Sequence, residues 1–171
     1  MVKEMKKIVV IGCPGSGKST FSRELHCITG IPLYHLDMMF WNSDKTTVER
    51  NIFMERLNSV LQKDEWIIDG NYASSMEQRI VACDMIVFLD YPLATCLEGI
   101  SQRRGKARAD IPWIETEDDE EFIEFIKKFN EEQRPLIINL LEKYKNKNIL
   151  VFSNRKQANA YLKGEGYEKS T

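Results

Sequence analysis

The stretch IVVIGCPGSGKST, residues 8–20, decides the fold of this chain. It opens with four consecutive apolar residues, which are typical of a strand buried on both faces. The pattern G-x-x-x-x-G-K-S follows without a break over residues 12–19, and a helical pattern begins near Ser19. Glycines let backbone N–H groups turn inward into a concave nest, and the N-terminus of the following helix points at the same place. The stretch therefore predicts a phosphate-binding loop between a strand and a helix.

The residues of this loop have distinct predicted roles. Lys18 supplies a mobile cation for the β- and γ-phosphates of a nucleoside triphosphate, and the Ser19 hydroxyl is a ligand for Mg²⁺. We therefore predict that the protein uses ATP and Mg²⁺. The predicted nucleotide-binding residues are Gly12, Pro14, Gly15, Ser16, Gly17, Lys18, Ser19 and Thr20.

Length and composition place the chain among ordinary globular proteins. Its 171 residues suit one domain, which we expect to span residues 1–171, and 43% of them are apolar while 29% are charged. The 24 basic and 26 acidic residues give a formal net charge of −2. This balance disfavours a protein whose whole surface binds nucleic acid, so nucleic acid is not an expected partner.

Cysteine usage and hydropathy favour a cytoplasmic protein. None of the four cysteines forms a C-x-x-C pair, so reduced thiols are expected rather than zinc ligands or disulfides. No apolar run approaches the ~18 residues that span a membrane, and the apolar stretch near the N-terminus is too short for a signal peptide. We accordingly expect no membrane partner.

The rest of the chain alternates between strand-like and helix-like patterns. Phe21, Leu25 and Ile28 are expected to form one buried face of the helix after the loop, and the capping box of Thr116 and Asp119 to begin a later helix. Because proline interrupts a helix, we expect a break next to Pro135. Alternating strands and helices predict an α/β sheet. Further strands are expected at residues 31–34, 66–68, 85–89 and 149–152, and a helix at Phe53, Leu57, Val60 and Leu61.

Three classes of phosphate-loop protein fit these patterns: switch GTPases, water-activating ATPases and small-molecule kinases. The GTPase base-reading pattern N-K-x-D is absent, because residues 146–149 read NKNI. The ATPase pattern of Asp-Glu at a strand end is also absent, because Asp69 and Asp90 have no glutamate beside them. A kinase needs no water-activating group and instead excludes water. These absences favour a kinase.

Further motifs span nearly the whole chain and keep a recognisable order. They are HLDMMFW at 35–41, WIIDGNY at 66–72, FLDYP at 88–92, the basic run RRGKARAD at 103–110 and FNEEQRP at 129–135. Together with the phosphate loop they resemble the adenylate-kinase-like branch of the P-loop kinases. The chain is most similar there to the bacterial DNA topology modulation protein family, which is related to adenylate kinases.

This resemblance implies a particular architecture. It implies a three-layer α/β/α P-loop NTPase fold with a five-stranded parallel sheet and the phosphate-loop strand at its centre. A short lid is implied at about residues 105–113, and an acceptor-side helical segment at 38–64. The family name concerns DNA topology, but no stretch of the chain reads as a DNA-binding module.

The chain departs from adenylate kinases where those enzymes grip a nucleoside monophosphate. An arginine shortly after the Asp-Gly pair is replaced by Ala73, and the next arginine is Arg79. Two further arginines expected near Thr116 and Phe125 are absent. A nucleoside monophosphate is therefore disfavoured as the acceptor.

Two carboxylates and a group of arginines are the remaining candidate site residues. Asp37 follows a short strand and is predicted to accept a hydroxyl proton or to orient water on Mg²⁺, the alternative being a helix cap. Asp69 is predicted to bind Mg²⁺ through water, the alternative being an Asp-Gly turn. At least one arginine of the basic run is predicted to clamp phosphate or to stack on the base, and the sequence leaves open which of Arg103, Arg104 and Arg108 does so. The alternative is that these arginines only compensate a helix C-terminus.

These observations predict an ATP- and Mg²⁺-dependent protein that transfers a phosphoryl group to an unidentified small-molecule acceptor. One alternative is a regulator that binds ATP and hydrolyses it slowly or not at all. A weaker alternative is a nucleic-acid-associated ATPase, which would show a strongly salt-dependent affinity for DNA.

Overall fold

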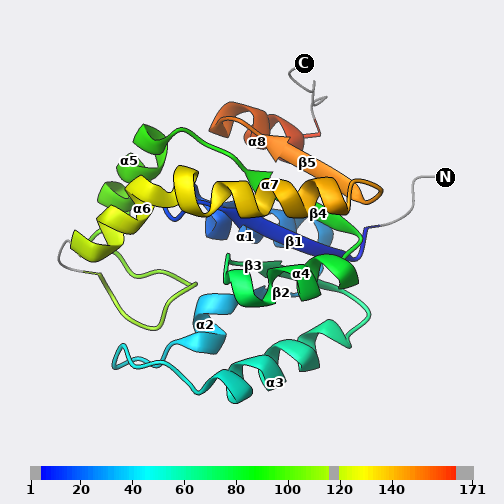
Figure 1. Ribbon diagram of the computed structural model, residues 1–171, viewed down its shortest axis with the longest axis horizontal. Helices are drawn as coiled ribbons and strands as arrows, with labels where there is room; N and C mark the ends of the chain where they lie inside the picture. Colours follow the sequence, from blue (N-terminus) through cyan, green and yellow to red (C-terminus); the bar gives the residue numbers. More distant parts are fainter. Residues whose placement is uncertain (1–4, 116–119, 165–171) are drawn as a thin grey trace.

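The computed structural model describes residues 5–115 and 120–164 and contains one parallel sheet (Figure 1). The strand order is β2-β3-β1-β4-β5, so the strand before the phosphate loop is central, as predicted. The strands are β1 (Lys7–Gly12), β2 (Leu33–His35), β3 (Trp66–Asp69), β4 (Met85–Leu89) and β5 (Asn148–Phe152). All five strand predictions are confirmed.

The register of the sheet brings three strand ends together. The inner strands β3 and β4 are buried along their whole length because both faces of the sheet are covered, which is why their sequences are continuously apolar. Val10 of β1 pairs with Asp69 of β3, and Gly12 pairs with Leu89 of β4. The phosphate loop therefore leaves the sheet at the edge where Asp69 ends its strand, which is where ligands bind in open α/β sheets.

Helices cover both faces of this sheet and give three layers. Helices α1 and α8 contact each other on one face, while α4 and α7 lie together in front of the sheet in Figure 1. Tyr144, at the end of α7, donates a hydrogen bond to Glu77 of α4 at 2.7 Å. The helices are α1 (Lys18–Thr29), α2 (Leu36–Phe40), α3 (Arg50–Leu61), α4 (Ala73–Ala82), α5 (Leu93–Arg103), α6 (Glu120–Glu132), α7 (Arg134–Lys143) and α8 (Arg155–Leu162).

Most of the predicted helix faces are buried. Phe53, Leu57, Val60 and Leu61 all belong to the core. The predicted break is also confirmed, because α6 ends at Glu132 and α7 starts at Arg134, with Pro135 in the first turn, where a missing N–H costs little. The prediction for Ile28 is wrong: its side chain is 61% exposed, since α1 ends one residue later, at the rim of the sheet.

Two sequence predictions concern the capping box and membrane-spanning helices. The capping box of Thr116 and Asp119 lies outside the described residues. Within residues 5–115 and 120–164, no helix is both long and apolar enough to cross a membrane.

Candidate active site

A cleft of about 750 Å³ lies where the strand ends meet. Its walls are the phosphate loop, the turn after β3, the C-terminal end of α5 and the segment that follows α5. The predicted site residues that line it are Pro14, Gly15, Gly17, Lys18, Ser19, Thr20, Asp37, Asp69, Arg103 and Arg108. A second hollow, of about 730 Å³ between β2 and α3, contains none of these residues.

The phosphate loop rests directly on the backbone of α5. A Cβ on Gly15 would lie 2.1 Å from the carbonyl oxygen of Cys96, and a Cβ on Gly99 would lie 2.1 Å from the carbonyl oxygen of Gly15. Both positions therefore need glycine. Ser16 is 2% exposed, and its hydroxyl has no hydrogen-bond partner. A buried hydroxyl without a partner, inside a nest of N–H groups, fits a phosphate ligand.

Lys18 lies folded back on the loop. Its Nζ donates to the carbonyl oxygen of Gly12 at 2.9 Å. Burial lowers the pKa of Lys18, while the charges of Asp69 and Asp37 act in the opposite direction. A phosphate would give this ammonium group a stronger partner than a carbonyl, because hydrogen bonds between ionised groups are about twice as strong as neutral ones.

The turn after β3, residues 69–72, connects three parts of the site. Asp69 accepts a hydrogen bond from His35 Nδ1 at 2.8 Å. The Asn71 side chain makes two hydrogen bonds with the backbone of Gly12, accepting from its N–H at 3.2 Å and donating to its carbonyl at 2.8 Å. The Tyr72 hydroxyl donates to Asp37 Oδ1 at 2.5 Å. We call residues 69–72 the DGNY turn.

Arg79 of α4 holds the DGNY turn from inside the protein. Its side chain is fully buried and donates to the carbonyl oxygens of Gly70, at 3.0 Å, and of Asn71 and Tyr72. Burial lowers the pKa of Arg79 to about 9, so the guanidinium stays charged at neutral pH. Tyr72 has a φ of 34°, a left-handed conformation that costs a non-glycine residue roughly 1–3 kcal/mol. Arg79 stabilises this turn and is not available to a phosphate group.

Asp37 lies in the first turn of α2, directly after β2. The N-cap of α2 is His35, and no side chain caps it, so the structure gives Asp37 no capping role. Burial raises the pKa of Asp37, while its hydrogen bond from Tyr72 and the charge of Lys18 oppose that shift. The carboxylate is thus more basic than an ordinary aspartate and lies within the electrostatic influence of the phosphate-loop lysine.

The segment expected to form a lid is folded against the site. The backbone N–H of Gly105 donates to the carbonyl of Glu115 at 2.5 Å, which closes residues 105–115 into a loop. Asp110 is 7% exposed, and the Trp113 ring meets the Trp41 ring at the end of α2 edge-on at 5.5 Å. In Figure 1 this loop runs beside α2.

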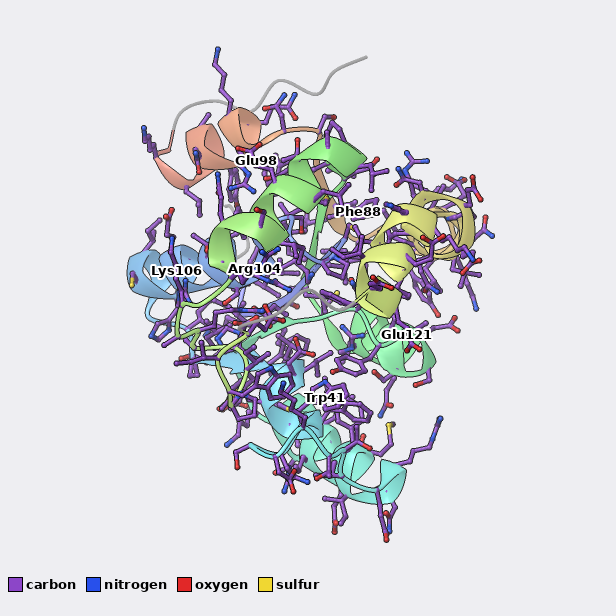
Figure 2. The ribbon with its side chains drawn as sticks, turned by 90° about the vertical axis from the view of Figure 1, so that its left-hand side faces the viewer. Trp41, Phe88, Glu98, Arg104, Lys106 and Glu121 are labelled. Carbon is purple, nitrogen blue, oxygen red and sulfur yellow. The ribbon has the colours of Figure 1, made fainter. Side chains whose placement is uncertain are left out.

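The three predicted arginines occupy different places. The Arg108 guanidinium makes paired hydrogen bonds with Asp110, at 2.9 and 2.5 Å, and a third with Glu115. Arg103 Nε lies 3.2 Å from the Glu115 carboxylate, without hydrogen-bond geometry. Arg104 is exposed and does not line the cleft; Figure 2 shows it with Lys106 near the end of α5.

Several residues of the site were not assigned roles from sequence. Asn71 and Tyr72 belong to a motif that sequence analysis noted, and their place directly after a strand end was the available signal. Arg155 lies in α8 and reaches the carbonyl oxygen of Gly15 at 3.4 Å. Nothing in the local sequence marks Arg155, because the fold alone brings α8 to the phosphate loop.

The donor atoms in the cleft suit a nucleotide with Mg²⁺. The Ser19 hydroxyl and the carboxylates of Asp37 and Asp69 line the same cavity, and oxygen ligands of this kind are those that Mg²⁺ prefers. Ser19 would bind the ion directly, and Asp69 would do so through water. Bound there, Mg²⁺ would neutralise charge on the phosphate oxygens.

Comparison with solved structures places the architecture among known folds. A shikimate kinase from Acinetobacter baumannii in complex with shikimate is 15% identical, with a TM-score of 0.62, and the match covers 95% of this chain and 91% of that one. The fold is that of a P-loop NTPase. The match to shikimate kinase from Bacteroides thetaiotaomicron has 18% identity, a TM-score of 0.56 and coverages of 94% and 96%. The shikimate kinase from Aquifex aeolicus is 21% identical, with a TM-score of 0.55, and the match covers 92% of this chain and 91% of that one.

At these identities the likeness to shikimate kinases establishes the fold alone. No protein-family model matches the chain, and no curated protein matches it. The resemblance to the DNA topology modulation family therefore remains a prediction from sequence motifs.

Proposed function

We propose that this protein is a small-molecule kinase, which transfers the γ-phosphoryl group of ATP to a hydroxyl group with the help of Mg²⁺. One observation carries the proposal: the DGNY turn ties the half-buried carboxylate of Asp37 to the phosphate loop. Asn71 holds Gly12 of that loop, and Tyr72 holds Asp37. A group that receives a proton and a group that holds the γ-phosphate are thereby fixed relative to each other.

The chemistry assigns each residue a role. Lys18 and the loop amides would hold the β- and γ-phosphates, while Asp37 would orient the acceptor hydroxyl. The hydroxyl oxygen forms the new bond to the γ-phosphorus, the bond to the bridging oxygen breaks, and ADP leaves. The hydroxyl proton goes to Asp37, whose pKa is raised by burial and thus suits this role. Arg103 and Arg108 remain proposed ligands of the transferring phosphate, for which Arg108 would have to exchange its contacts with Asp110 and Glu115. Arg104 lies outside the cleft.

The lining of the cleft supports exclusion of water during transfer. The segment after α5 forms one wall of the cleft, with Asp110 and Ile111 buried and Trp113 against Trp41. We propose that it closes over the cleft when the ligands are bound. A covered site protects a phosphoryl group from hydrolysis. We also propose a cytoplasmic location, since all four cysteines are free thiols, as is usual in a reducing compartment.

The test is a screen for acceptor-stimulated release of ADP over nucleosides, sugars, hydroxy acids and nucleotides. With the best acceptor, Asp37→Asn should keep ATP affinity within a few-fold and lose at least a hundredfold in turnover, because positioned general-base catalysis is typically worth 10²–10⁴. Asp90→Asn is the matched control: Asp90 directly follows β4, pairs with Arg134 at 2.9 Å and does not line the cleft. Binding of ATP with no acceptor-stimulated turnover would instead favour a regulator.

A further inference from the structure

We call the part of the cleft that is lined by Asp37, Trp41, Tyr72, Ala73 and Asp110 the acceptor end. Under the proposed function, the molecule that receives the phosphoryl group binds here. The charged and apolar groups of this end therefore indicate which class of molecule it accepts.

The arginines that could serve this end already have partners. Arg103 Nε lies 3.2 Å from the Glu115 carboxylate, and its guanidinium lies over the Phe122 ring. Arg79, the first arginine after the DGNY turn, is fully buried and donates to three backbone carbonyls. Both sides of the Arg108 guanidinium are occupied, one by Asp110 and the other by Glu115. A phosphate or carboxylate on the acceptor would have to displace these contacts to find a guanidinium.

The other cations of the cleft lie at the nucleotide end or at the rim. Arg23 of α1 is within 3.5 Å of the hydroxyls of Ser19 and Thr20, and Arg155 reaches Gly15 of the phosphate loop. Lys106 is exposed near the end of α5 (Figure 2). The positive charge is thus arranged for the phosphates of ATP.

The acceptor end itself offers carboxylates and aromatic rings. Asp37 Oδ1 accepts from Tyr72, and both oxygens of Asp110 accept from Arg108. Each carboxylate oxygen can accept a second hydrogen bond, so both groups still have room for a ligand hydroxyl. Phe40 contacts Trp41 edge-on at 5.4 Å and Tyr72 at 5.0 Å, so the ring wall is fixed by packing. Such a wall favours a flat or apolar face on the ligand. An anion here would lie beside the half-buried carboxylate of Asp37.

We infer that the acceptor is an uncharged hydroxyl compound with a flat or apolar face, and not a phosphate or carboxylate. The Asp37 and Asp110 carboxylates bind its hydroxyls, and the ring wall of Trp41 and Tyr72 covers its face. Nucleosides have this chemistry, whereas their monophosphates do not.

The test uses pairs of compounds that differ in charge at one group. The pairs are the common nucleosides against their 5′-monophosphates, and shikimate methyl ester against shikimate. Binding is measured by calorimetry in the presence of Mg²⁺ and a non-hydrolysable ATP analogue, and ADP release is measured with ATP. We expect the uncharged member of at least one pair to bind at least tenfold more tightly than its anionic partner. Tighter binding of the anionic members, or no binding by any uncharged member, overturns the inference.

A substitution tests the same reasoning in the opposite direction. Ala73 is exposed, lines the cleft and has room for a longer side chain, so Ala73→Arg places a free guanidinium at the acceptor end. This variant should bind the anionic member of a pair at least tenfold more tightly than the wild type does. Ser74→Arg, on an exposed neighbour outside the cleft lining, should not. An Ala73→Arg variant that binds the anions no better than Ser74→Arg does would contradict the inference.

The binding and turnover measurements separate this inference from the proposed function. If an uncharged compound binds selectively but stimulates no ADP release, the kinase proposal fails and the ligand class stands. If an anionic compound is phosphorylated best, the kinase proposal stands and the ligand class is wrong.

Discussion

Replacing Tyr72 by phenylalanine should raise the pKa of Asp37. The Tyr72 hydroxyl donates to Asp37 Oδ1 at 2.5 Å and stabilises the ionised carboxylate, thereby opposing the effect of burial. Tyr72→Phe removes this donor and keeps the ring, which packs against Phe40 and Phe53. The carboxylate then stays half-buried with one partner fewer.

The magnitude follows from the strength of the lost hydrogen bond. A hydrogen bond to a charged group contributes roughly 1.5–3 kcal/mol. One unit of pKa corresponds to about 1.36 kcal/mol, so the pKa of Asp37 should rise by roughly 1–2 units. Because the general base must be ionised, the acid limb of the kcat/KM profile should move to higher pH by the same amount.

Carbon-13 NMR of aspartate carboxyl groups measures this pKa without any acceptor. The Asp37 resonance is identified by its absence in Asp37→Asn, and its titration is compared between the wild type and Tyr72→Phe. Tyr91→Phe removes another buried tyrosine hydroxyl, from the loop after β4, and should leave the Asp37 midpoint unchanged. A midpoint that is the same in Tyr72→Phe and the wild type would refute the link between the DGNY turn and Asp37.

Three further outcomes are expected. Mg·ATP at about 100 times its Kd should stabilise the wild type by ~2.7 kcal/mol. Each kcal/mol should raise the Tm in a thermal melt by roughly 2–4 °C, and Lys18→Ala should abolish the rise. Gly15→Ala should lower the free energy of unfolding in urea by about 3 kcal/mol, because the new Cβ would meet the carbonyl of Cys96 at 2.1 Å; Gly17→Ala, with open space around its Cβ, should cost less. Trp113→Ala should speed amide hydrogen exchange over residues 105–111, since the ring contact with Trp41 holds that loop in place; unchanged exchange would show that other contacts hold it.

The sheet and the phosphate loop were predictable because their signals are local. A continuous apolar run indicates a strand that is covered on both faces, and the loop glycines indicate where the backbone approaches a ligand. The run at residues 31–34 was the weakest of the five and forms the short edge strand β2 at 33–35, which is half-buried. An edge strand has one neighbour and less cover, so its pattern is less apolar.

The connections within the site were not predictable because they depend on tertiary packing. Arg79 lies several residues after the Asp-Gly pair, so the sequence does not show whether its side chain points to the cleft or to the core. The rotation of α4 about its axis places the Arg79 side chain in the core. Arg103 and Arg104 are neighbours in sequence, but the end of α5 directs only Arg103 toward the cleft. The left-handed Tyr72 lies in the turn whose carbonyls Arg79 binds, and this contact across seven residues is encoded in no local pattern.

The fate of the γ-phosphoryl group tests the central claim most directly. The protein is incubated with Mg²⁺, ATP labelled with phosphorus-32 at the γ-position and the best acceptor from the screen, and the products are separated by chromatography. Lys18→Ala serves as the control for a contaminating kinase. The kinase account predicts that the label appears in an organic phosphoester, in an amount equal to the ADP formed, and is absent with Lys18→Ala. Label found only in inorganic phosphate, or remaining in ATP, would contradict it.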